Sequence, residues 1–219
     1  MDPLRRNVNR MVYSFGMSYD AEETRRRIFL AASAEFAAHG LAGARVDRIA
    51  TAAKANKQAI YLYFGNKEAL FGSVVQAKVD EVCHADLLDP AAAGESVGQL
   101  FDWYREHPDL IRLLLWEALE TAGGPVVGEA ERREGYVAVV NDLVEGGAAD
   151  AFPEGEPRTR AAQDWMFTLL GLVAWNFAVP QLCRLVLDEQ DQEIALDRRR
   201  ATLVETVRAL TAARTPAGP

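Results

Sequence analysis

Residues that begin and end helices recur along the whole chain, and they constrain its fold more than any other feature of the sequence. Asp20 and Glu23 have the spacing of a capping box, Gly40 can end the helix that follows, and Asn56 and Asn66 can each cap a further helix. Apolar residues recur at helical spacing between these signals, and no stretch alternates apolar and polar residues over a useful length. The sequence therefore predicts an all-α fold.

The same signals divide the chain into segments. The first helices are expected over residues 20–40, 46–53 and 57–64, and a long fourth helix is expected to begin at Lys67. Breaks rich in glycine and proline separate about five more helices after it. We therefore expect a flexible arm over residues 1–19, a three-helix domain over 20–66, a larger helical domain over 67–213 and a disordered tail over 214–219.

Charge is distributed unevenly along the chain. Residues 1–78 hold 12 Lys and Arg against 7 Asp and Glu, whereas residues 79–219 hold 12 against 25, within a formal net charge of −8. A basic segment attached to an acidic body suits a protein whose one end meets a polyanion. Chance clustering is the alternative, because the basic surplus is small.

The sequence contains few of the residue patterns on which enzymes depend. Cys83 and Cys183 stand 100 positions apart in no metal-ligand spacing, which favours a reducing, cytoplasmic compartment. Cys83 beside His84 is interpreted as a free thiol on a helix, since helix neighbours point in different directions. No glycine-rich phosphate loop, nucleophile elbow or HExxH motif occurs. We therefore expect no catalytic residue, no metal and no cofactor.

The strongest functional signal lies in Val46–Phe71, VDRIATAAKANKQAIYLYFGNKEALF. Two short helices separated by Lys54-Ala55-Asn56 match a helix-turn-helix, and small residues let the two helix axes approach closely. The second helix is then a rod of about 12 Å, near the width of the DNA major groove. The side chains expected inside are Ile49, Ala50, Ala53, Ile60 and Phe64.

The remaining side chains of this segment suit contacts with DNA. Gln58 can pair with adenine, Lys57 can donate to guanine, and Ala59 and Leu62 can meet thymine methyl groups. Phosphates are the expected partners of Tyr61, Tyr63 and Lys67. The alternative is that the two tyrosines are half-buried core residues and that Lys67 is a solvated charge.

These residues resemble the TetR/AcrR family of bacterial transcriptional regulators. The resemblance is strongest over Thr24–Phe71 and most specific in IYLYFGNKEAL, and the later LVAWNFAVPQLCRLVL is similar to a helix of the family's dimer bundle. It implies an N-terminal helix-turn-helix DNA-binding domain joined by the long fourth helix to a larger ligand-binding and dimerisation bundle. It also implies a homodimer on a palindromic operator, released when a ligand enters a pocket in the larger domain.

The chain departs from the family pattern at two places. Ala44 and Arg45 stand where a hydroxyl pair is usual, so Arg45 is expected to supply a phosphate contact by charge. Lys54 stands where a glycine is common in the turn. A positive φ at that residue would cost about 1 kcal/mol, because Lys54 carries a Cβ.

An uncharged run of 19 residues, Trp165–Cys183, is long enough to cross a membrane. Its polar residues, Pro180 and the lack of anchoring residues on both sides instead favour a helix buried between two copies of the chain. The candidates for this dimer interface are Trp165, Leu169, Leu172, Trp175, Asn176, Val179 and, from the last helix, Leu203.

Aromatic residues are numerous in the second domain. At helical spacing they form core more often than a pocket, yet with the nearby carboxylates of Asp102, Glu117 and Glu120 they would favour an apolar and even a cationic small molecule. The pocket candidates are Trp103, Trp116, Glu117 and Phe167.

The sequence thus predicts a cytoplasmic, nucleoid-associated regulator that binds a double-stranded DNA operator as a homodimer. Repression relieved by an unidentified small hydrophobic effector is the expected mode of action, with no membrane as partner. A second hypothesis is an all-helical enzyme or small-molecule carrier that uses the aromatic cavity. A third is a helical scaffold whose uncharged run docks on a membrane or a partner.

Overall fold

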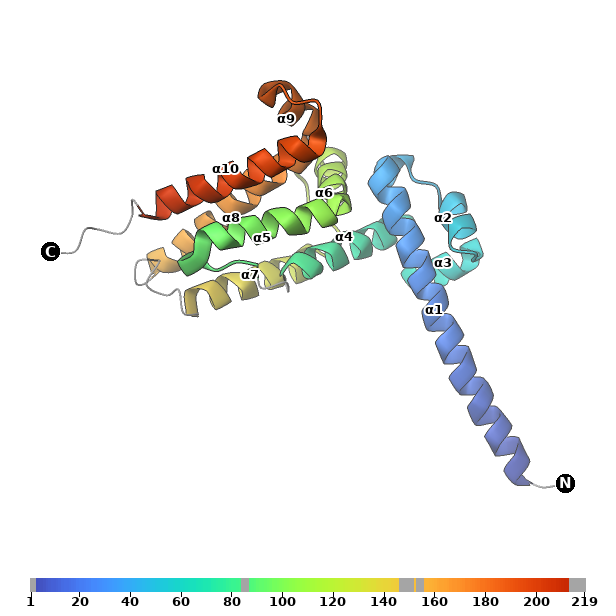
Figure 1. Ribbon diagram of the computed structural model, residues 1–219. Coiled ribbons are helices and arrows are strands. Elements are labelled where there is room, and N and C mark those ends of the chain that lie inside the picture. Colours follow the sequence, from blue (N-terminus) through green and yellow to red (C-terminus); the bar gives the residue numbers. More distant parts are fainter. Residues whose placement is uncertain (1–2, 84–86, 146–151, 153–155, 213–219) are drawn as a thin grey trace. The chain divides into compact units, whose positions relative to one another are not determined.

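The computed structural model describes residues 3–83, 87–145, 152 and 156–212 (Figure 1). Its helices are α1 (Pro3–Gly43), α2 (Val46–Ala52), α3 (Lys57–Phe64), α4 (Lys67–Cys83), α5 (Ala93–Glu106), α6 (Pro108–Thr121), α7 (Glu129–Glu145), α8 (Glu156–Ala178), α9 (Pro180–Leu187) and α10 (Gln192–Ala212). A 3-10 turn, Pro90–Ala92, precedes α5. The described residues contain no strand, and the predicted all-α fold is confirmed. His84, the tail over 214–219 and the side chains of residues 1–19 lie outside the described part.

Helix boundaries near the predicted helix-turn-helix agree closely with the sequence. α3 has the predicted bounds, and α2 ends one residue early. Gly40 has φ 66° and ψ −179°, so the helical backbone breaks at this residue as predicted. α1 is already helical before Asp20, however, and the capping box does not begin it. Glu23 instead accepts hydrogen bonds from Arg26 at 2.8 and 2.9 Å. Side chains three residues apart are neighbours on a helix surface, so this pair is favourable in the middle of a helix.

The chain folds into two units, and the first comprises Met1–Val74 and Trp116–Val127. Its core is formed by fully buried side chains of Ile28, Phe36, Ile49, Ile60 and Leu70. The end of α6 packs on the corner between α1 and α2. There the Trp116 indole N–H donates to the Ala37 carbonyl at 3.4 Å, and the Ala42 N–H donates to Glu120 Oε1 at 3.0 Å.

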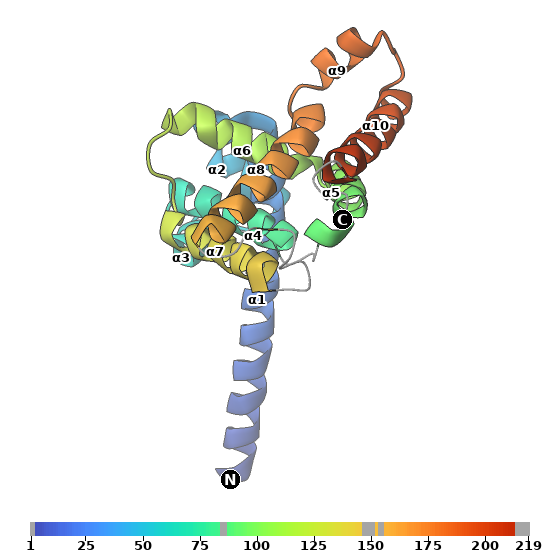
Figure 2. The same ribbon diagram turned by 90° about the vertical axis from the view of Figure 1, so that its left-hand side faces the viewer.

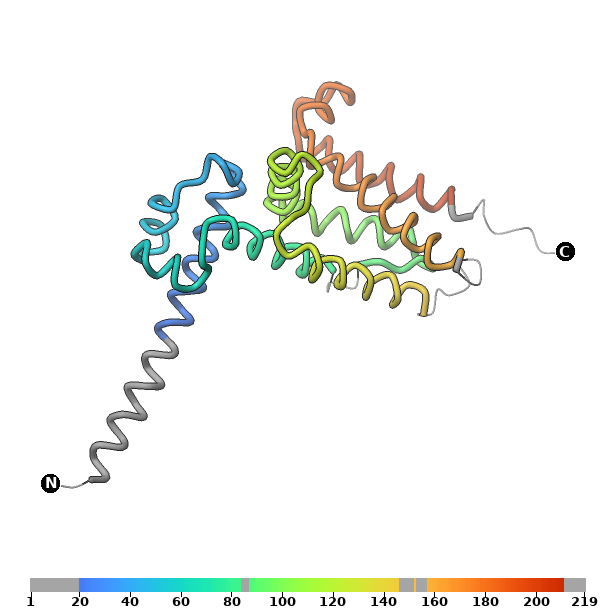
Figure 3. The backbone as a smooth tube through the Cα atoms, turned by 180° about the vertical axis from the view of Figure 1, so that it is seen from behind, coloured from blue at the N-terminus to red at the C-terminus, as the bar shows by residue number. Residues whose placement is uncertain are grey.

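The second unit comprises Val75–Leu115 and Gly128–Pro219. Within it α5 packs against both α8 and α10, and α7 packs against α8, an arrangement that can be followed from behind in Figure 3. Gly98 lets α10 approach α5, because a Cβ there would lie 3.1 Å from Arg200. Arg200 in turn donates to both carboxylate oxygens of Asp102, at 2.7 and 2.6 Å. Arg208 pairs with Glu95 along the same seam.

Two helices supply residues to both units. α4 lies in the first unit up to Val74 and in the second from Val75, and α6 passes from the second unit to the first between Leu115 and Trp116.

The uncharged run Trp165–Cys183 forms the C-terminal part of α8 and the start of α9. In Figure 2, α9 lies beyond the ends of α8 and α10. Among the described residues no single helix is long and apolar enough to cross a membrane. The segments Pro157–Ala178 and Pro180–Leu187 meet that criterion only as a pair, and they bend by 84° at their junction.

Candidate nucleic-acid interface and ligand cavity

The turn between α2 and α3 has the hydrogen bonds of a Schellman motif. The Lys54 N–H donates to the Thr51 carbonyl at 3.2 Å, and the Ala55 N–H donates to the Ala50 carbonyl at 2.9 Å. Lys54 occupies the left-handed position with φ 51°. Glycine is the usual residue there because it has no Cβ, so the turn keeps its geometry at a cost of about 1 to 2 kcal/mol.

Side-chain caps fix the starts of α3 and α4 as the sequence predicts. Asn56 Oδ1 accepts from the Ala59 N–H at 2.7 Å, and α3 begins at the next residue, Lys57. Asn66 Oδ1 accepts from the Ala69 N–H at 2.6 Å at the start of α4. These bonds satisfy amides that the helix itself leaves without a partner.

α3 turns one side to the core and the other to solvent. Ile60 is fully buried, whereas Leu62 is 79% exposed and Tyr61 49% exposed. Ala59 and Tyr63 are half-buried on the flanks of the helix. We call the exposed side the reading face, and its members are Lys57, Gln58, Tyr61 and Leu62.

The basic candidates already have partners or neighbours within the first unit. Lys57 Nζ lies 2.6 Å from Asp47 Oδ1 on α2, and this hydrogen bond raises the pKa of Lys57. Lys67 Nζ lies 3.4 Å from the Ala44 carbonyl, which places Lys67 beside Arg45. Arg45 is exposed and stands at the N-cap of α2, where its side chain makes no capping bond.

Glu35 on α1 replaces the missing cap of α2, and sequence reasoning did not identify it. Its carboxylate accepts from the Arg45 N–H at 2.8 Å and from Arg48 Nε at 2.8 and 3.0 Å. Desolvation acts to raise the pKa of Glu35, but the bonds from Arg48 and Arg45 outweigh it and hold the pKa below the ordinary value. Glu35 thus fixes the position of α2 relative to α1.

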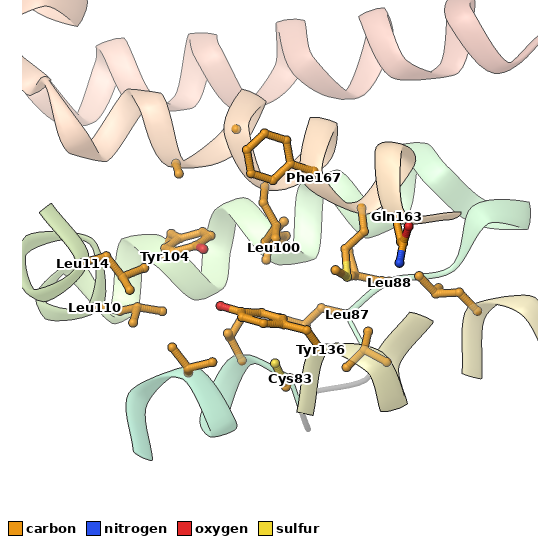
Figure 4. Close-up of a pocket in the computed structure, with 18 of the residues that line it drawn as sticks. Cys83, Leu87, Leu88, Leu100, Tyr104, Leu110, Leu114, Tyr136, Gln163 and Phe167 are labelled. Carbon is orange, nitrogen blue, oxygen red and sulfur yellow. The ribbon is translucent and has the colours of Figure 1, made fainter. Parts of the chain in front are cut away.

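The second unit contains a cavity of about 780 Å³, a size typical of small-molecule sites. Residues of α4, α5, α6, α7 and α8 line it, and most of them are apolar. Figure 4 shows Phe167 and Leu100 on one side of the cavity and Tyr136 and Cys83 on the opposite side, with Tyr104 toward one end. Burial raises the pKa of the Cys83 thiol to about 11, so the thiol is neutral and a poor nucleophile near pH 7.

Of the four pocket candidates, Phe167 is the one that lines this cavity. Trp103 stacks on His107 with ring centroids 4.2 Å apart, and it is not among the lining residues. Trp116 and buried Glu117 belong to the first unit. Helical spacing could not distinguish these positions, because it gives no information on which neighbour each helix face meets.

The dimer candidates divide by burial. Leu169, Asn176 and Leu203 are buried within their own chain. Trp175 is 60% exposed. The half-buried members are Trp165, Leu172 and Val179. The single chain therefore covers part of the predicted interface and leaves Trp175 on its surface.

An exposed reading face on a helix-turn-helix, together with a second unit that contains an apolar cavity, defines a DNA-binding regulator with its own effector domain. Residues 28–74 match the description "Bacterial regulatory proteins, tetR family", and residues 93–209 match "Tetracyclin repressor-like, C-terminal domain". The chain belongs to the tetR family of bacterial regulatory proteins, and it is a DNA-binding transcriptional regulator.

Two named relatives and one solved structure agree with this assignment. The HTH-type transcriptional repressor SCO4008 of Streptomyces coelicolor is 43% identical over 176 residues, which cover 78% of this chain and 88% of that protein. The HTH-type transcriptional repressor NicS of Pseudomonas putida is 38% identical over 106 residues, covering 45% of this chain and 50% of NicS. The crystal structure of SCO4942 from S. coelicolor matches with a TM-score of 0.68 at 31% identity, covering 85% of this chain and 97% of that one.

Proposed function

We propose that this chain is a cytoplasmic, nucleoid-associated repressor that binds a palindromic operator as a homodimer and leaves it when a small apolar molecule fills the cavity. The observation that carries the proposal is the reading face of α3, where Lys57, Gln58, Tyr61 and Leu62 are exposed on a helix whose opposite side is anchored by buried Ile60. Repression is supported by the names of SCO4008 and NicS, both called transcriptional repressors. Neither relative is named as an enzyme, and the carrier or enzyme hypothesis is not favoured.

A homodimer is supported by the apolar surface on the last three helices. Leu185 and Val186 on α9 are 70% and 73% exposed, and Trp175 on α8 and Ile194 on α10 are also exposed. α9 has no buried residue, although it has one strongly apolar side. A second copy of the chain would cover this surface and bring two reading faces together, as a two-fold operator requires.

Release by a ligand is supported by the two shared helices. α6 contributes Leu110, Ile111 and Leu114 to the cavity, and its last turns hold Trp116 and Glu120 against the corner between α1 and α2. A ligand that shifts the lining part of α6 would move this anchor, because the helix is continuous. Ligand binding and DNA release are coupled in this way if the ligand binds more tightly when α6 is shifted than when it is not.

Operator selection from random-sequence duplexes by the full chain tests the proposal. We expect enrichment of two inverted half-sites whose centres lie about one helical turn of DNA apart, or a small multiple of this distance, with an affinity that falls steeply with salt. Lys67→Ala should weaken binding to all sequences alike and flatten the salt dependence, whereas Arg133→Ala, on the exposed side of α7, should not. No enriched sequence and no salt-dependent binding would refute the proposal.

A further inference from the structure

The described residues that line the cavity carry charge of one sign. Among the described residues that line it, Asp142 on α7 and Asp164 on α8 are the two charged ones, and none is Lys, Arg or His. Both carboxylates are exposed, so they stand where the cavity meets solvent. Among these described residues, an anionic ligand would meet two like charges and no compensating cation.

These two carboxylates differ from others in the same unit. Asp102 is held by Arg200, Asp197 by Arg105 and Glu95 by Arg208. Within the part of the chain that the structure describes, neither Asp142 nor Asp164 has an ion-pair partner or accepts a hydrogen bond through its carboxylate. A bound cation would therefore gain two carboxylate neighbours without breaking an existing ion pair.

The other polar groups among the described lining residues belong to a glutamine, two tyrosines and a cysteine. Burial raises the pKa of the Tyr104 hydroxyl well above its ordinary value, and the Cys83 thiol is likewise held in its neutral form. The rings of Tyr104, Tyr136 and Phe167 offer aromatic faces and edges within the cavity (Figure 4). Aromatic faces attract organic cations, and the effect grows as water is excluded.

We propose that the effector is an organic cation, with an apolar body packed among the aliphatic and aromatic walls and an ammonium or similar group near Asp142 and Asp164. The inference rests on the proposed function, since it names the chemical class of the molecule that releases DNA. The carboxylates from which the sequence predicted a cationic ligand do not line the cavity. Asp102 pairs with Arg200, and Glu117 and Glu120 belong to the first unit.

Three probes with one alkyl chain and different head groups test this class by calorimetry on the full chain without DNA. They are decyltrimethylammonium, 1-decanol and decyl sulfate, each used below its micelle concentration. We expect the cation to bind at least about tenfold more tightly than the alcohol, and the sulfate to bind most weakly. Equal affinities for the three probes, or binding by none of them, would overturn the inference.

Charge-removing variants show whether the two named carboxylates cause the preference. Asp142→Asn with Asp164→Asn should remove most of the preference for the cation and leave the affinity for decanol unchanged. Glu134→Gln, an exposed carboxylate on α7 that does not line the cavity, should leave both affinities unchanged. An unaltered preference in the double variant, with its thermal unfolding intact, would contradict the assignment. If the chain binds the cation but no operator, the proposed function fails and the ligand class stands.

Discussion

Replacement of Lys54 by glycine is expected to stabilise the chain. Lys54 has φ 51° at the left-handed position of the turn after α2, where a residue with a Cβ is strained by about 1 to 2 kcal/mol. Glycine relieves this strain, but its greater freedom in the unfolded chain offsets about 0.4 to 1 kcal/mol. The midpoints of these two ranges differ by about 0.8 kcal/mol, so we expect Lys54→Gly to raise the free energy of unfolding by about that amount.

Lys54→Ala is the matched control, because it removes the same charge and keeps the Cβ. Its free energy of unfolding should lie within about 0.5 kcal/mol of that of the unaltered chain. Urea unfolding followed by circular dichroism measures both variants, and equal stabilities of Lys54→Gly and Lys54→Ala would refute the argument from backbone strain. A loss of DNA affinity that both variants share is caused by removal of the Lys54 charge. A difference in DNA affinity between the two variants is caused by the changed backbone strain in the turn.

Three further changes probe the first unit. Asp47→Asn removes the partner of Lys57 and a negative charge near the reading face. Operator affinity, measured by fluorescence anisotropy, should therefore rise severalfold, and its salt dependence should steepen. Unchanged binding would show that this ion pair plays no part in DNA binding. Glu35 has a lowered pKa when folded, so its contribution to stability is present above the unfolded value of about 4.3 and is lost as pH falls through the folded value. Glu35→Gln should therefore flatten the dependence of unfolding on pH in that acid range, and an unchanged profile would contradict this role. Gly40→Ala would place a Cβ 2.6 to 2.8 Å from Glu120 and Trp116 at a residue with positive φ. It should lower the free energy of unfolding by about 2 to 4 kcal/mol in the same urea assay. Gly43→Ala is the control, because its Cβ would have its nearest contact at 3.4 Å, and its effect should be much smaller.

Local features of the fold could be predicted from the sequence. Asn56 and Asn66 cap α3 and α4 because a short polar side chain reaches an amide three residues on, and this geometry needs no information from the rest of the chain. The alternation of buried Ile60 with exposed neighbours on α3 likewise follows from helical period alone.

Features that depend on distant segments could not be predicted. Glu35 caps α2 from ten residues before Arg45, a distance that no local motif specifies. Asp142 and Asp164 share a cavity only because α7 packs against α8. The predicted start of α1 at Asp20 was wrong for a different reason, since Glu23 can pair inside a helix as readily as it can cap one.

The contribution of Gln58 to DNA specificity tests the central claim, that the reading face of α3 reads base edges. The measurement is a parallel operator selection with the unaltered chain and with Gln58→Ala, scored base pair by base pair. We expect the variant to lose about 1 to 3 kcal/mol of discrimination at one base pair in each half-site and to keep its preferences elsewhere. Identical base preferences of the two proteins at every position would contradict the account.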